Sequence, residues 1–119
     1  MDASASVADE MIKEFMSEIW YVKDILKPDK LTLIIFDTKI RSVIEITEDT
    51  QIEDIAIKGR GGTSVREIID WGMDNDPTAM VILTDGEFDG YEPVIDYPLL
   101  WIIYDQTEWE SNIGEVIYY

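Results

Sequence analysis

Three short, largely apolar runs constrain the fold of this chain more than any other feature. They cover Leu31–Phe36, Ala79–Leu83 and Leu99–Tyr104, and each is bounded by turn-forming or charged residues. Apolar runs of this length are typical of strands buried on both faces, as in a parallel sheet with helices packed on either side. The runs therefore predict a central sheet that is covered on both faces.

Two amphipathic segments are expected to supply that cover. Val7–Leu26 carries apolar side chains at helical spacing, and Pro28 is expected to end this helix. Ser6 is the expected N-cap, with Asp9 three residues later completing a capping-box-like start. A second helix is expected over Val65–Met73, directly after a glycine-rich loop. Because helices and strands alternate, the pattern favours an α/β sandwich with a mostly parallel sheet.

Three further segments are predicted to be strands. Ile40–Thr47 is mixed in polarity and is expected to pair with Leu31–Phe36 through a hairpin turn over residues 37–39. Ile55–Lys58 is expected to form a brief strand, and Glu115–Tyr119 a last strand at an edge of the sheet. The length of 119 residues suits a single domain, so residues 1–119 are expected to form one unit.

Charge and composition exclude several classes of function. Nine basic and 26 acidic side chains give a formal net charge of −17, which disfavours binding of nucleic acid through a basic face. The chain contains neither histidine nor cysteine, which excludes Ser-His-Asp catalysis, thiol nucleophiles, disulfides and zinc held by these residues. A bound metal must therefore take oxygen ligands, which favours magnesium, calcium or manganese.

The composition also indicates a folded domain without a membrane-spanning segment. Hydrophobic residues make up 46% of the chain, which is ample for a packed core. No apolar run approaches the roughly 20 residues that a membrane span needs, and the N-terminus lacks the pattern of a secretory signal. We therefore expect a soluble cytoplasmic domain.

Polar side chains gather where the predicted strands end. Asp37, Asp85 and Asp105 follow the three apolar runs, one after each. Ligands of open α/β sheets bind beyond the carboxyl ends of the strands, and the glycine-rich loop at residues 59–64 opens a helix at the same edge. The polar loop at residues 2–6 precedes the first helix at this edge too. Carboxylates and hydroxyls without histidine or cysteine indicate a site for a hard cation.

The spacing of these residues resembles a known family. Asp2, Ser4 and Ser6 form a D-x-S-x-S motif, Thr63 lies in a second loop, and Asp85 lies in a third. This order resembles the metal-ion-dependent adhesion site of the von Willebrand factor A (VWA) family. The runs FDTKI, IKGRGGTS, LTDG and LLWII are similar to the bacterial VWA-like domains that follow a metallopeptidase-like region in longer proteins. The resemblance covers nearly the whole chain.

The resemblance implies a Rossmann-like three-layer α/β sandwich and a divalent cation, Mg²⁺ or else Mn²⁺ or Ca²⁺. The hydroxyls of Ser4, Ser6 and Thr63 would be ligands, while Asp2 and Asp85 would act directly or through water. Neutral hydroxyl ligands leave the cation electrophilic, so an acidic residue of a partner protein can complete its coordination. The implied function is metal-dependent protein–protein interaction without catalysis. A MoxR-type AAA+ ATPase is the implied partner, in the assembly or remodelling of complexes.

One feature departs from the family pattern. The family's first strand lies at the centre of the sheet and runs into the D-x-S-x-S aspartate, yet only Met1 precedes Asp2 here. We favour a truncated or split form of a longer domain. Alternatively, another chain or Glu115–Tyr119 supplies the strand, or the sheet closes around the gap with a changed strand order. Exposed strand edges would also allow a homodimer or strand exchange.

Two other functions stay open. The first is a Mg²⁺-dependent phosphohydrolase or nuclease, whose carboxylate cluster would be Asp2, Asp37, Asp85 and Asp89. Its phosphate would need a cationic residue, for which the candidates are Lys39, Arg60 and Arg66. The second is a metal-free scaffold, whose site is empty because the N-terminal strand is lost. Each motif taken alone is also typical of an ordinary cap, loop or turn. The aromatic residues Tyr91, Tyr97, Trp101 and Trp109 are more typical of core and rim, but Phe88 or Tyr91 would become a partner contact if exposed beside the metal.

Overall fold

A computed structural model describes residues 1–51, 55, 57, 59, 61–88 and 90–119. The helices are α1 (Asp9–Tyr21), its continuation as a π-helical turn η1 (Val22–Leu26), and α2 (Arg66–Asn75). The strands are β1 (Leu31–Phe36), β2 (Ile40–Ile46), β3 (Met80–Thr84), β4 (Leu99–Ile103) and β5 (Glu115–Tyr118). None of the helices formed by these residues combines the length and the apolar composition needed to cross a bilayer.

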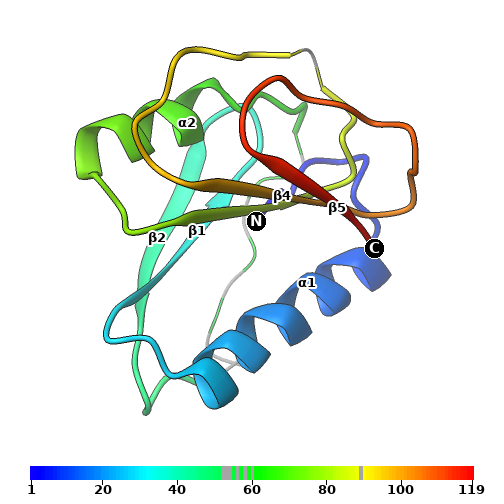
Figure 1. Ribbon diagram of the computed structural model, residues 1–119. Coiled ribbons are helices and arrows are strands. Elements are labelled where there is room, and N and C mark those ends of the chain that lie inside the picture. Colours follow the sequence, from blue (N-terminus) through cyan, green and yellow to red (C-terminus); the bar gives the residue numbers. More distant parts are fainter. Residues whose placement is uncertain (52–54, 56, 58, 60, 89) are drawn as a thin grey trace.

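The strands lie between two helical layers, with α1 on one side and α2 on the other (Figure 1). Successive side chains of a strand point to opposite faces. Accordingly, Leu33 and Ile35 of β1 lie in the core cluster that contains the buried face of α1. Ile34 and Phe36 lie in the second cluster, which contains the buried face of α2. The predicted three-layer α/β sandwich is therefore confirmed.

The described strands form two sheets. β1 and β2 pair antiparallel through the predicted hairpin, and β3, β4 and β5 pair parallel in that order. β5 pairs with β4 at an edge, as expected for the C-terminal strand. The alternative in which Glu115–Tyr119 fills the central position is therefore wrong.

The first three residues occupy the place between the two sheets. The Phe36 amide donates to the Met1 carbonyl (3.1 Å) and the Ala3 amide donates to the Phe36 carbonyl (2.8 Å), which gives a parallel bridge to β1. On the other side, the Asp2 amide donates to the Leu83 carbonyl of β3 (2.8 Å). A short extended segment at the N-terminus thus joins the β1–β2 hairpin to the parallel sheet.

Two local predictions differ from the structure. The N-cap of α1 is Ala8 and not Ser6, because Ser6 Oγ instead lies 3.2 Å from Ser4 Oγ. The helix therefore begins two residues later than the capping box predicted. Of the expected strand at Ile55–Lys58, the described residues Ile55 and Ile57 are not in a strand, and the other two lie outside the described residues.

Helix α2 packs closely on the loop before β4 through Gly72. A Cβ atom at Gly72 would overlap the Tyr97 ring, nearest Cζ and at 2.6 Å from both Cε1 and Oη. The Tyr97 hydroxyl donates to the Ile69 carbonyl (2.8 Å), and the ring is buried, so it has little room to move. Burial also raises the pKa of Tyr97 to about 12, so the phenol remains a donor at neutral pH. Glycine at position 72 is therefore required for this contact.

We expect Gly72→Ala to lower the free energy of unfolding by about 1–2 kcal/mol, because steric overlap outweighs the gain of about 1 kcal/mol in helix propensity. Urea unfolding followed by circular dichroism measures the change. The control is Gly90→Ala, since no atom of the described residues lies within 4 Å of a Cβ built there. That control should change stability by less than about 0.5 kcal/mol. Equal effects of the two substitutions would contradict the packing described.

Candidate functional site

Asp2 is a fully buried carboxylate between the two sheets. Its Oδ1 accepts a hydrogen bond from the Ser4 amide (2.8 Å), and its Oδ2 accepts one from the Thr84 hydroxyl at the end of β3 (2.6 Å). Within the described part of the chain, no lysine or arginine forms an ion pair with Asp2. Two hydrogen bonds therefore hold a buried carboxylate that lacks a compensating cationic side chain there.

The hydroxyls of Ser4 and Ser6 lie close together in the loop that begins at Asp2. Their Oγ atoms lie 3.2 Å apart, with Ser4 buried and Ser6 exposed. Neighbouring ligands of an octahedral Mg²⁺ ion, at about 2.1 Å from the metal, lie about 3 Å from one another. The pair of hydroxyls is thus spaced as two ligands of one such ion would be.

The glycine-rich loop lies against the same N-terminal segment. The Ala5 amide donates to the Gly61 carbonyl (2.8 Å), so this loop and the D-x-S-x-S loop run side by side. Thr63 follows two residues later and is partly exposed, whereas Ser64 bonds through its amide to the Asp37 carbonyl (2.9 Å). The fold therefore brings the loop of Thr63 to the loop that carries the two serines.

Asp37 anchors the glycine-rich loop. Its side chain is fully buried and accepts hydrogen bonds from Arg41 Nε (2.8 Å), the Lys39 amide and the Gly61 amide (both 3.2 Å). Burial by itself raises the pKa of Asp37. The hydrogen bonds and the charge of Arg41 outweigh this effect and hold the pKa below its usual value. Asp37 is therefore a charged structural carboxylate with its own cation.

Asp85 follows β3 directly and is almost fully buried. Its Oδ1 accepts a hydrogen bond from the Glu87 amide (3.1 Å), and the side-chain amide of Gln106 donates to its carbonyl. As for Asp2, no lysine or arginine of the described residues forms an ion pair with it. The turn at Gly86 (φ +77°) then carries the chain away from the sheet.

The three loops that carry the predicted ligands meet at one edge of the molecule. Hydrogen bonds tie the loop at residues 2–6 to Gly61 on one side and to β3 on the other. No group of three or more aspartate or glutamate side chains among the described residues is placed to hold a metal. The carboxylate cluster of the enzymatic alternative is therefore not found there, and Asp89 and Arg60 lie outside the described residues. A metal site at this edge depends on hydroxyl ligands.

Two residues that hold the buried aspartates in place were not predicted from the sequence. Thr84 holds the Asp2 carboxylate across 82 positions of the chain, and the only local signal is its place before Asp85 in LTDG. Arg41 compensates Asp37 from the facing strand of the hairpin. Its signal is the spacing of four residues across a predicted turn. Asp105 is exposed and lies in a bend after β4, with left-handed backbone (φ +63°).

We expect Arg41→Met to destabilise the protein at pH 7, because it leaves Asp37 buried and charged without its cation. The depressed pKa of Asp37 stabilises the fold above the usual aspartate range, about pH 4, and this stabilisation is lost as the pH falls through the folded-state value. The gap between wild type and variant in urea midpoint should therefore close at low pH.

The matched control for this experiment is Lys30→Met. Lys30 and Glu45 lie 3.7 Å apart with most of both side chains exposed, so their ion pair contributes little. This control should leave the urea midpoint nearly unchanged at either pH. A deficit of Arg41→Met that persists undiminished at pH 3 would contradict the assigned role of Asp37.

Comparison of the whole chain with known families supports this fold. A family described as "VWA-like domain (DUF2201)" matches residues 1–119. Neither the curated proteins nor the solved structures gave a match. The metal-ion-dependent adhesion site and the association with a metallopeptidase-like region stay predictions. Since the family match spans the full sequence and the chain folds as an α/β sandwich, the protein belongs to the family of VWA-like domains.

Proposed function

We propose that the protein is a metal-dependent interaction domain. In this proposal Mg²⁺, or else Mn²⁺ or Ca²⁺, is held by Asp2, Ser4, Ser6, Thr63 and Asp85. The proposed setting is the cytoplasm. A partner protein contributes an acidic residue, and the bound cation supplies an open coordination position for that carboxylate.

One contrast within the molecule carries the proposal. Three buried carboxylates lie near this edge, and Asp37 has Arg41 as its cation. Asp2 and Asp85 have no such ion pair among the described residues. Buried carboxylates without a cationic side chain beside them are suited to bind a cation from outside the chain. The hydroxyls of Ser4 and Ser6, in the loop that begins at Asp2, lie 3.2 Å apart, a spacing that suits adjacent ligands.

The donor set favours binding over catalysis. Hydroxyl and carboxylate oxygens suit Mg²⁺, Mn²⁺ and Ca²⁺. Asp37, which the hydrolase alternative needs as a free carboxylate, is already bonded to Arg41 and to two backbone amides. Arg66, one of its candidate phosphate ligands, instead lies over the Tyr91 ring at 4.1 Å. We therefore propose a non-enzymatic role, with a MoxR-type AAA+ ATPase as the proposed partner.

The metal site is tested by calorimetric titration of Mg²⁺ into wild type, Thr63→Val and Asp85→Asn. These changes remove one hydroxyl or one charge while keeping the side-chain shape. We expect a single site in wild type and at least tenfold weaker binding in each variant, because each loses a ligand. Thr107→Val and Asp96→Asn change exposed residues of the same types and should bind as wild type does.

The interaction is tested with the peptide acetyl-Gly-Asp-Gly-amide, titrated by NMR with Mg²⁺ and then with EDTA. The control peptide has asparagine in place of the aspartate. The proposal is supported if the aspartate peptide changes the chemical shifts of the loops of Ser4 and Thr63 only when Mg²⁺ is present, and if the asparagine peptide does not change them. Absence of Mg²⁺ and Mn²⁺ binding by wild type would overturn it. Equal binding of the two peptides would overturn the role of the partner's carboxylate.

A further inference from the structure

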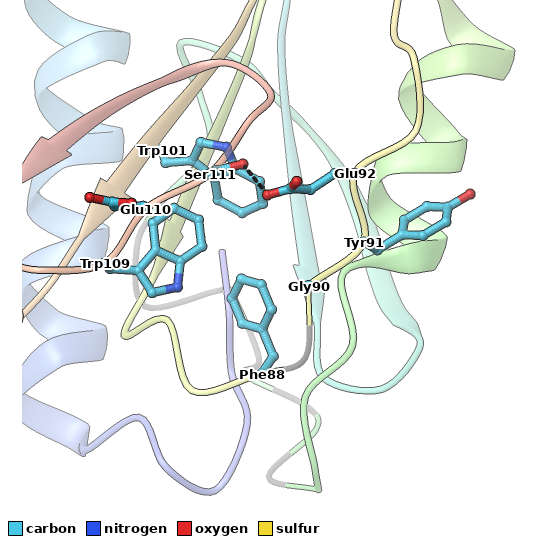
Figure 2. A pocket seen from close by; sticks show the side chains of 8 residues that line it. All are labelled: Phe88, Gly90, Tyr91, Glu92, Trp101, Trp109, Glu110 and Ser111. Atoms are coloured by element: carbon cyan, nitrogen blue, oxygen red, sulfur yellow. Dashed lines mark hydrogen bonds between the residues drawn. The ribbon is translucent and has the colours of Figure 1, made fainter.

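A group of aromatic side chains lies beside the candidate metal edge, which is the edge of the molecule where the loops of Ser4, Thr63 and Asp85 meet. Three aromatic rings form a compact group: Phe88 lies 5.9 Å from Trp101 and 5.8 Å from Trp109, and the two tryptophans lie 5.0 Å apart, between ring centroids. Trp101 is buried, whereas Phe88 and Trp109 are only partly covered. Figure 2 shows these rings together along a pocket whose other lining includes Glu92.

The size of the pocket restricts what can enter it. Its volume is about 170 Å³. Pockets for cofactors and drug-sized ligands are larger, at about 300–1,000 Å³. The space therefore suits one side chain of a partner.

The charge of the lining selects the kind of side chain. Glu92 and Glu110 line the pocket, and no lysine or arginine is among its described lining residues. Glu92 accepts hydrogen bonds from the Asn112 amide (2.9 Å), the Asn112 side chain (2.7 Å) and the Ser111 hydroxyl (3.3 Å). The two Asn112 bonds, with that of Ser111, lower the pKa of Glu92, so its carboxylate is charged at pH 7. Aromatic faces beside carboxylates attract cations.

The flat aromatic rings of the pocket favour the guanidinium of arginine over the ammonium of lysine. A guanidinium is planar and stacks on aromatic rings. One of its N–H groups can donate to Glu92 Oε2, which accepts a single hydrogen bond from the described residues, whereas Oε1 accepts two. The protein already contains one such stack at the rim of this region, where Arg66 Cζ lies 4.1 Å from the Tyr91 ring centroid. The Tyr91 hydroxyl is bonded to Asp70 (2.8 Å), and Figure 2 shows its ring turned away from the other three. Phe88 and Trp109 are partly exposed, so theirs are the rings that a ligand would contact.

The pocket is joined to the candidate metal edge by a short turn. Phe88 lies three residues after Asp85, and a Cβ at Gly86 would lie 2.7 Å from Trp109 Cδ1. Trp109 thus rests directly on the turn that follows Asp85. One partner surface could contact both places at once, which would raise its overall affinity.

We propose that this pocket, lined by Phe88, Trp101, Trp109, Glu92 and Glu110, binds an arginine side chain of a protein partner. The site goes beyond the proposed metal-dependent function, because no metal takes part in it. It also gives the strongly acidic chain a specific contact for a basic residue.

The test is an NMR titration of the wild-type protein with acetyl-Gly-Arg-Gly-amide, which follows the indole N–H signals of Trp101 and Trp109. EDTA is present, so that failure of the proposed metal site does not affect the result. Salt at 0.15 M limits the Debye length to about 8 Å and suppresses general attraction by the net charge. We expect saturable shifts of the Trp109 signal with the arginine peptide, weaker ones with the lysine peptide, and none with the neutral citrulline peptide.

Charge variants locate the site. Glu110→Gln and Glu92→Gln should each weaken the binding of the arginine peptide by about threefold to fivefold, as expected for the loss of one partly exposed ion pair. Glu48→Gln removes an equal charge from an exposed loop and should leave the affinity unchanged. The proposal is overturned if the tryptophan signals do not move, if citrulline or lysine binds as tightly as arginine, or if Glu48→Gln weakens binding as much as Glu110→Gln.

Discussion

The pairing of residues Met1–Ala3 between β1 and β3 is the constraint on which the rest of the structure depends. These residues supply backbone partners to Phe36 on one side and Leu83 on the other. Without them, a two-stranded hairpin and a three-stranded sheet would face each other with unpaired backbone groups, which is costly in a buried position. The same pairing fixes Asp2 at the point where the strand ends converge.

The burial of Asp2 follows from this position and sets the chemistry of the edge. Its carboxylate is held by one backbone amide and one threonine hydroxyl, both neutral donors. Asp37, one strand away, shows the alternative arrangement, in which an arginine compensates the buried charge. The difference between these two aspartates separates a structural carboxylate from one suited to an external cation.

The fold was largely predictable because its strongest signals are local. β1, β3 and β4 are mostly buried, apart from the exposed Val81 of β3, so their apolar runs mark them to within one residue at either end. The predicted N-cap of α1 was wrong, because Ser6 fits both a capping pattern and a D-x-S-x-S loop. Only the fold shows that its hydroxyl lies beside that of Ser4. The role of Thr84 depends on a neighbour 82 positions away, which no local pattern reveals.

The candidate site was also predictable only in part from the sequence. The order of the five residues indicated a shared edge, and the hydrogen bonds from Ala5 to Gly61 and from Thr84 to Asp2 bring their loops together. The aromatic pocket was less visible, because Phe88, Trp101 and Trp109 become neighbours only through the parallel sheet and the turn at Gly86.

The central claim is that five residues from three loops bind one cation. Substoichiometric Mn²⁺ added to ¹⁵N-labelled protein tests it most directly, because the paramagnetic ion broadens the amide signals nearest to it. The account predicts the strongest broadening at Asp2, Ser4, Ser6, Thr63 and Asp85 together, and its reversal by excess Mg²⁺. Broadening centred on another acidic surface, such as Asp74 and Asp76 at the end of α2, would contradict it.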